Sequence, residues 1–206
     1  MILKKIVLLF LLGVFSLPGI AQKKPITIEE EKTKNRIIFY ALNKNLQDVD
    51  VVLTVTGIGF KQRGGVERPI RVPATSRVQV KSIIKERNKY PMYEYTLETT
   101  DSLSRRALRP TAEKIKINPY KPILLYSTAA CKQCDTISKS LAAGPYIFKT
   151  MLLAEKPDVT KVLKRSIPAI DTISTPIMSL GGYLYTDIVT YEGLLEKLKE
   201  IEDDGE

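Results

Sequence analysis

Residues 123–135 read ILLYSTAACKQCD and decide how the C-terminal half of this 206-residue chain folds. The first five residues, ILLYS, form a short apolar run that is typical of a buried β-strand. Cys131 and Cys134 follow, and the residues after them place Ile137 and Leu141 at the i, i+4 spacing of one helix face. The stretch therefore predicts a strand, then a loop, then a helix that begins at the cysteine pair.

The sequence beyond this stretch alternates between strand and helix patterns. Residues 146–153 are typical of a strand, residues 156–166 of a helix with one apolar face, and residues 191–201 of an amphipathic helix. Residues 177–186 carry a central Gly-Gly step, which predicts a β-hairpin. The resulting order of strand, helix, strand, helix, strand, strand and helix is typical of an α/β fold.

The Cys-Lys-Gln-Cys sequence is the strongest candidate for chemistry in the chain. Backbone N–H groups without partners and the helix dipole favour a thiolate over a thiol at the beginning of a helix. We expect Cys131 to be the exposed nucleophile, and Cys134, one turn further in, to resolve a mixed disulfide. Lys132 adds a positive charge beside the thiolate, and Gln133 and Asp135 are further neighbours expected to modulate the pair.

The strand, the Ser/Thr-rich loop, the CxxC motif and the helix together resemble the thioredoxin-like superfamily, and within it the glutaredoxins. Thr175-Pro176, before the hairpin, resembles a second family element, a cis-proline beside backbone that pairs with an extended substrate. The resemblance covers roughly residues 122–201. It implies a mixed sheet with flanking helices, thiol–disulfide exchange by Cys131 and Cys134, and substrate binding at Thr175 and Pro176.

The sequence departs from the glutaredoxins at the place where they bind glutathione. Their Gly-Gly-Asp-like turn would fall near Thr186-Asp187, where this sequence has no such turn. We therefore expect no cofactor, and glutathione-dependent chemistry ranks last among the interpretations.

Two other interpretations of the cysteine pair stay open. The first is a permanent structural disulfide in a non-enzymatic envelope binding protein. The second is a zinc site, but the chain has no histidine and no third cysteine, so only carboxylates remain to complete it. The absence of histidine also excludes His-based catalytic triads, and we expect no metal.

The N-terminus has the three parts of a secretory signal peptide over residues 1–22. Lys4 and Lys5 precede an apolar run at residues 6–15, and Ala21 is a small residue at a plausible cleavage point. The apolar run is short for a membrane span, which needs about 20 residues; an uncleaved anchor is the alternative. We expect an exported protein, periplasmic or extracellular, with no transmembrane segment in the mature chain.

The first half of the mature chain has the pattern of an all-β domain. Short alternating runs separated by Gly and Pro turns predict a β-sandwich at residues 36–118, which precedes the thioredoxin-like domain at residues 119–201. Residues 23–35 are polar and predict a flexible lead-in. Residues 202–206 predict an acidic tail.

The net charge of +9 is unevenly distributed. Residues 23–121 carry 21 basic and 11 acidic side chains, whereas residues 122–206 carry 9 basic and 12 acidic ones. The basic residues between Lys61 and Lys89 are interpreted as solvated strand faces, with an envelope-surface patch as the alternative. No nucleic-acid motif is present, so the expected partner is a protein substrate or redox partner, docked by the sandwich.

Overall fold

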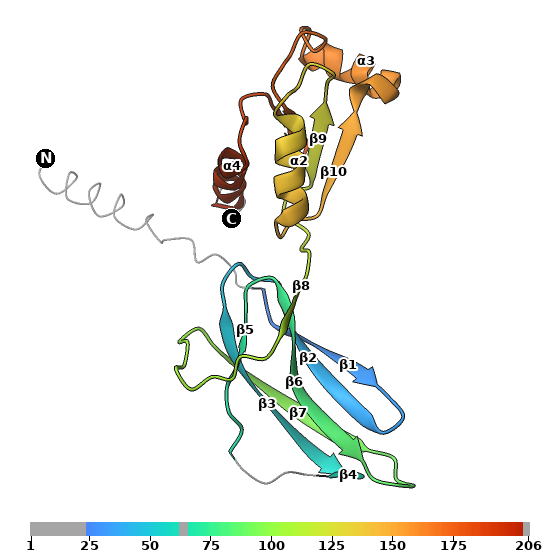
Figure 1. Cartoon of the computed structure of the whole chain (residues 1–206), viewed down its shortest axis with the longest axis vertical. Coiled ribbons are helices and arrows are strands. Elements are labelled where there is room, and N and C mark those ends of the chain that lie inside the picture. Colours follow the sequence, from blue (N-terminus) through green and yellow to red (C-terminus); the bar gives the residue numbers. More distant parts are fainter. Residues whose placement is uncertain (1–23, 62–65, 204–206) are drawn as a thin grey trace, which may run out of the picture.

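The computed structural model describes residues 24–61 and 66–203, which form two units joined end to end (Figure 1). The N-terminal unit, residues 24–115, is built from strands, and the C-terminal unit, residues 116–203, combines strands with helices. The signal peptide predicted at residues 1–22 lies outside the described residues. The predicted acidic tail begins inside α4 (Tyr191–Asp203), and its remaining residues also lie outside.

Two antiparallel sheets build the N-terminal unit. The first has the order β1-β2-β6-β4, and β8 also pairs with β6. The strands of this sheet are β1 (Thr27–Lys32), β2 (Arg36–Asn43), β4 (Phe60–Lys61), β6 (Ser76–Lys85) and β8 (Ala112–Lys114). The second has the order β5-β3-β7, from β5 (Ile70–Val72), β3 (Val49–Ile58) and β7 (Met92–Thr100).

Alternating residues of both sheets fill one shared apolar core. Phe39 of β2, Val51 of β3 and Val78 of β6 expose at most 1% of their surface. Tyr93 and Tyr95 of β7 pack edge-on against Phe39, with ring centroids 5.6 and 6.0 Å away. This burial of every second residue explains why β2 and β3 occupy the runs that the sequence pattern predicts.

The predicted flexible lead-in is wrong over residues 27–32, which form β1. β1 pairs antiparallel with residues 37–42 of β2, and the Ile28 side chain packs against the shared core. The strand is rich in glutamate because it lies at the edge of the sheet, where Arg77 donates a 3.2 Å hydrogen bond to Glu29. Polar sequence at a sheet edge lacks the alternating apolar pattern by which strands are recognised.

A four-stranded mixed sheet forms the centre of the C-terminal unit, in the order β10-β9-β11-β12. Strand β9 (Ile123–Ser127) is parallel to β10 (Phe148–Leu152) and antiparallel to β11 (Ile177–Leu180). Strand β11 continues through a Gly-Gly turn into β12 (Tyr183–Tyr185). The helices are α2 (Cys134–Ala143), η1 (Leu153–Glu155), α3 (Pro157–Ser166) and α4.

Helices cover both faces of this sheet. On one face, Leu125 of β9 and Met178 of β11 share a core with α2 and α4. On the other face, Tyr126 and Ile177 pack in a second core with Leu163 of α3. β9 is buried on both faces, which is why its sequence is continuously apolar rather than alternating. None of the helices within the described ranges is long and apolar enough to cross a membrane.

The chain passes from one unit to the other within three residues. The backbone N–H of Ile115 donates to Thr75 of the N-terminal unit at 2.9 Å, and that of Ile117 donates to Pro145 of the C-terminal unit at 2.8 Å. Ile117 is buried in the C-terminal core. The boundary therefore lies at Lys116, two residues before the end of the β-sandwich predicted at residue 118.

Candidate functional site

The two cysteines lie at the junction between β9 and α2. β9 ends at Ser127, and a turn in which the Cys131 N–H donates to the Thr128 carbonyl at 3.2 Å leads to the cysteine pair. Cys134 is the first residue of α2. The two sulfur atoms are bonded as a disulfide, with Cα atoms 5.6 Å apart. The sequence prediction of a strand, a loop and a helix around this pair is confirmed.

The cysteines are more buried than the sequence suggests. Cys131 exposes 9% of its surface and Cys134 only 2%. Both belong to the core that the sheet shares with α2 and α4. Cys131 is the more accessible of the two, as expected, but the expectation of a well exposed side chain is wrong for this disulfide form.

The beginning of α2 surrounds the pair with helix-end electrostatics. Gln133 occupies the N-cap position and makes no side-chain capping hydrogen bond. The first N–H groups of the helix, at and after Cys134, therefore remain oriented toward the loop. Such a helix end stabilises a negative sulfur when the disulfide is reduced.

The three residues predicted to modulate the pair are exposed. Lys132 and Gln133 lie between the cysteines, and Asp135 lies in the first turn of α2. Lys132 follows Cys131 directly in sequence, so it places a positive charge next to the proposed nucleophile. Asp135 instead adds a negative charge at the same helix end, so the two side chains act on a thiolate in opposite directions.

The sheet register brings Thr175 and Pro176 to the same end of the unit as Cys131. Ile177, the first residue of β11, is paired with Tyr126, so the residues just before it lie beside the end of β9. Pro176 is buried and Thr175 is half-buried. Two segments that lie more than 40 residues apart in sequence thus meet where the cysteines lie.

The cis-proline implied by the family resemblance is wrong. Every peptide bond among the described residues is trans, including the bond between Thr175 and Pro176. Trans is the isomer that an X–Pro bond favours by about 0.5–1 kcal/mol when packing does not select the other.

A hydrogen bond that sequence reasoning missed connects the two segments. The Thr128 hydroxyl donates to the carbonyl oxygen of Ile173 at 2.9 Å, across 45 residues of sequence. This bond ties the turn before Cys131 to the loop before Pro176. The Ser/Thr-rich composition of residues 127–128 was the available signal, but composition alone does not specify the distant acceptor.

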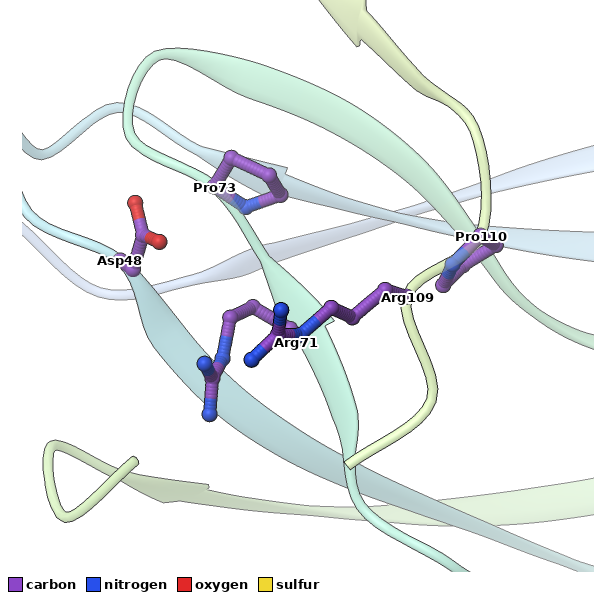
Figure 2. Close-up of a pocket in the computed structure, with 5 residues that line it drawn as sticks. All are labelled: Asp48, Arg71, Pro73, Arg109 and Pro110. Carbon is purple, nitrogen blue, oxygen red and sulfur yellow. The ribbon is translucent and has the colours of Figure 1, made fainter. Parts of the chain in front are cut away.

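The N-terminal unit contains an open pocket of about 220 Å³, lined by Asp48, Arg71, Pro73, Arg109 and Pro110 (Figure 2). Arg71 is held by the fully buried carboxylate of Asp50, through hydrogen bonds of 2.8 and 3.1 Å. These hydrogen bonds hold the pKa of Asp50 below its ordinary value. Arg71 is thus already paired within the protein, and we interpret the pocket as the open side of this structural ion pair.

No three His, Cys, Asp or Glu side chains come together as a metal-binding group in the part of the chain that the structure describes. Comparison with protein-family models, with curated proteins and with solved structures found no match. The function is therefore argued from the site itself.

Proposed function

We propose that this chain is an exported thiol–disulfide oxidoreductase that acts on proteins through Cys131 and Cys134. The observation that carries the proposal is a disulfide within a Cys-X-X-Cys sequence at the junction of a central strand and a helix N-terminus. At this junction a thiolate is stabilised, and a second chain segment, residues 173–176, lies beside it. We assign the C-terminal unit to the thioredoxin-like class and the N-terminal unit to the β-sandwiches. A mixed sheet with helices on both faces and two sheets around one core support these assignments.

The proposed reaction is a two-step exchange. The Cys131 thiolate attacks one sulfur of a substrate disulfide, forms a mixed disulfide, and releases the other substrate sulfur as a thiolate. The Cys134 thiolate then attacks the Cys131 sulfur, which releases the second substrate thiolate and leaves the Cys131–Cys134 disulfide. Two electrons pass from the cysteine pair to the substrate, and the same steps run in reverse when the substrate is a dithiol.

The relative burial of the cysteines fits these roles. Cys131 is the more accessible sulfur-bearing residue, and Cys134 is nearly inaccessible within the helix. An external sulfur therefore reaches Cys131 first, and the mixed disulfide is attacked from inside by Cys134. Thr175 and Pro176 form the wall beside which an extended substrate would lie.

Export is part of the proposal. The tripartite pattern of residues 1–22 directs secretion, and disulfides persist in oxidising compartments. The Cys131–Cys134 disulfide is consistent with both.

The decisive experiment is a trapping assay with the Cys134→Ser variant and a fluorescent peptide that contains one disulfide. The variant should accumulate a mixed disulfide through Cys131, because the resolving sulfur is absent. Cys131→Ser is the matched control, with the same number of thiols, and should trap little or nothing. Equal trapping by both variants, or by neither, would contradict the proposed roles.

A second candidate function is a non-enzymatic envelope binding protein in which the disulfide only staples α2 to its loop. The burial of both cysteines favours it, since only 9% of Cys131 is exposed. In that case dithiothreitol would reduce the disulfide slowly. The equilibrium would also lie far toward the oxidised form, as for structural disulfides of secreted proteins.

A further inference from the structure

The end of the N-terminal unit that lies away from the C-terminal unit is an ordered group of strand ends and a loop (Figure 1). We call it the projection. It consists of the end of β3, strand β4 and the loop between β6 and β7. Ile58 pairs with Met92 across β3 and β7, and the N–H of Glu86 donates to the Gly59 carbonyl at 3.0 Å. A Cβ atom at Gly59, whose φ is 81°, would lie 2.5 Å from the Tyr90 carbonyl oxygen. Glycine at this position thus allows the loop to pack against the end of β3.

Three large apolar side chains are exposed on this projection, which we call the apolar tip: Ile58, Tyr90 and Met92. Their exposed fractions are 68%, 95% and 69%. Ile58 and Met92 are direct cross-strand partners, so their side chains leave the sheet on the same face. An ordered loop that keeps three such side chains in water indicates a surface that is covered by a partner.

The residues around the apolar tip are positively charged. Segments 57–61 and 85–93 together contain four basic residues and one acidic residue, Glu86. The basic residues, which we call the cationic rim, are Lys61, Lys85, Arg87 and Lys89. Glu86 pairs with Lys89 at 2.6 Å, and Lys85 donates to the Thr33 carbonyl at 2.7 Å. Arg87 and Lys61 are exposed.

We propose that the apolar tip and the cationic rim dock this protein on an anionic phospholipid surface. The tip lies at the end of the N-terminal unit that faces away from the C-terminal unit (Figure 1), where it can contact an extended surface such as a membrane. A lipid interface can take up exposed apolar side chains. Its anionic headgroups, which lie at the surface of the same interface, can pair with the basic side chains around them. Tyrosine, with an apolar ring and a polar hydroxyl, is suited to that interface.

An acidic protein surface is the other partner that the charge would suit. Such a surface would neutralise the cationic rim but would leave the three apolar side chains at the contact without an apolar environment. The combination of both features on one loop end therefore favours the lipid surface.

Docking through this tip would hold the cysteines away from the lipid. The loop between β9 and α2 lies at the opposite end of the molecule from the β6–β7 loop (Figure 1). The C-terminal unit would then face the aqueous compartment and its protein substrates. The docking proposal does not use the cysteines, so it can fail while the proposed activity stands.

The chain contains no tryptophan, so a single introduced indole can be excited and followed without interference from another indole. Tyr90→Trp places an indole at the tip, and Tyr183→Trp places one at a 70% exposed position of the C-terminal unit as the matched control. Both chains begin at residue 23, because the apolar run at residues 6–15 would itself bind vesicles and every described strand and helix lies after it. Circular dichroism checks that they are folded.

With vesicles that contain one third phosphatidylglycerol, the indole of Tyr90→Trp should shift to shorter emission wavelengths and be quenched by brominated acyl chains. The indole of Tyr183→Trp should do neither. Vesicles of phosphatidylcholine alone should bind at least about tenfold more weakly, and binding to the anionic vesicles should weaken as salt is added.

Sedimentation with the same vesicles measures the side chains without an indole. Tyr90→Ser with Met92→Ser should lower the partition coefficient at least about tenfold, whereas Tyr120→Ser with Tyr183→Ser should leave it within about twofold. The proposal is overturned if anionic vesicles do not bind, if both indoles respond equally, or if binding occurs with the tip indole still in water. The first outcome would redirect the search to an acidic protein partner.

Discussion

The two units of this chain differ in how charge and burial are used. The N-terminal unit holds an ion pair between the fully buried Asp50 and the partly buried Arg71, on neighbouring strands. The C-terminal unit buries a disulfide, Cys131 with Cys134, just beyond the end of its central strand. Both pairs tie separate chain segments together, but only the disulfide can be broken and re-formed by thiols, which is why the proposed activity is assigned to it.

The first prediction tests the proposed role of the cysteine pair in the C-terminal unit. Cys131→Ser should lower the rate of disulfide exchange by about a thousandfold or more, because the other cysteine, Cys134, is buried and a thioether cannot begin the reaction. Hydrogen exchange in the strands of the N-terminal unit should not change. The measurement is turnover of the disulfide peptide together with exchange monitored by mass spectrometry. A residual rate within tenfold of the parent would mean that Cys131 is not the nucleophile.

The second prediction tests how much the ion pair of the N-terminal unit contributes to stability. Asp50→Asn should destabilise the N-terminal unit by about 3 kcal/mol, because Arg71 loses its charged partner and the Ser104 N–H loses a 2.5 Å hydrogen bond to carboxylate. Urea unfolding measures the change. Asp171→Asn is the matched control: Asp171 pairs with Lys164 on the surface, where the loss should stay below about 1 kcal/mol. Equal effects of the two variants would show that burial of Asp50 is not decisive.

The third prediction concerns acid. The hydrogen bonds from Arg71 lower the pKa of Asp50 in the folded protein from its ordinary value of 3.8. The carboxylate therefore stabilises the N-terminal unit above that value, and this contribution is lost as the pH falls through the lower, folded-state pKa. The stability difference between the parent chain and Asp50→Asn should shrink as the pH falls from about 4 to about 2. A difference that stays constant over this range would contradict the coupling.

The fourth and smallest effect concerns the tether between the two segments of the site. Thr128→Val removes the hydroxyl that donates to Ile173 and should cost about 1 kcal/mol. It should slow exchange a few-fold, since the turn before Cys131 and the loop before Pro176 are no longer tied. Thr136→Val, on the exposed side of α2, is the control and should leave the rate unchanged. If both variants slow exchange equally, the tether has no part in the reaction.

Sequence reasoning was strongest where burial alternates or is continuous. The sequences of β2 and β3 alternate with a period of two because one face is buried, and the sequence of β9 is continuously apolar because both faces are buried. It failed for β1, whose glutamates face water at a sheet edge and look like a polar linker.

For the site, the cysteine pair and its place at the beginning of a helix were predictable from local sequence. The isomer of the Thr175–Pro176 bond, the burial of Cys131 and the Thr128–Ile173 hydrogen bond were not. Each depends on contacts between segments far apart in the chain, which spacing within one segment does not encode.

The junction at Lys116 has a mechanical consequence. Its neighbours Ile115 and Ile117 are each hydrogen-bonded into a different unit, and its ammonium group donates to the Leu141 and Ala142 carbonyls at the end of α2, at 3.2 and 2.6 Å. Because peptide bonds are planar, the backbone here turns chiefly about the φ and ψ of one residue. A change in those two dihedral angles would reorient one unit against the other, and the Lys116 ammonium group, held at the end of α2, opposes such a change. Inserting a single glycine beside Lys116 would lengthen the junction without changing either core. It would change the distance between the cysteine pair and the N-terminal unit but leave the proposed exchange chemistry unchanged.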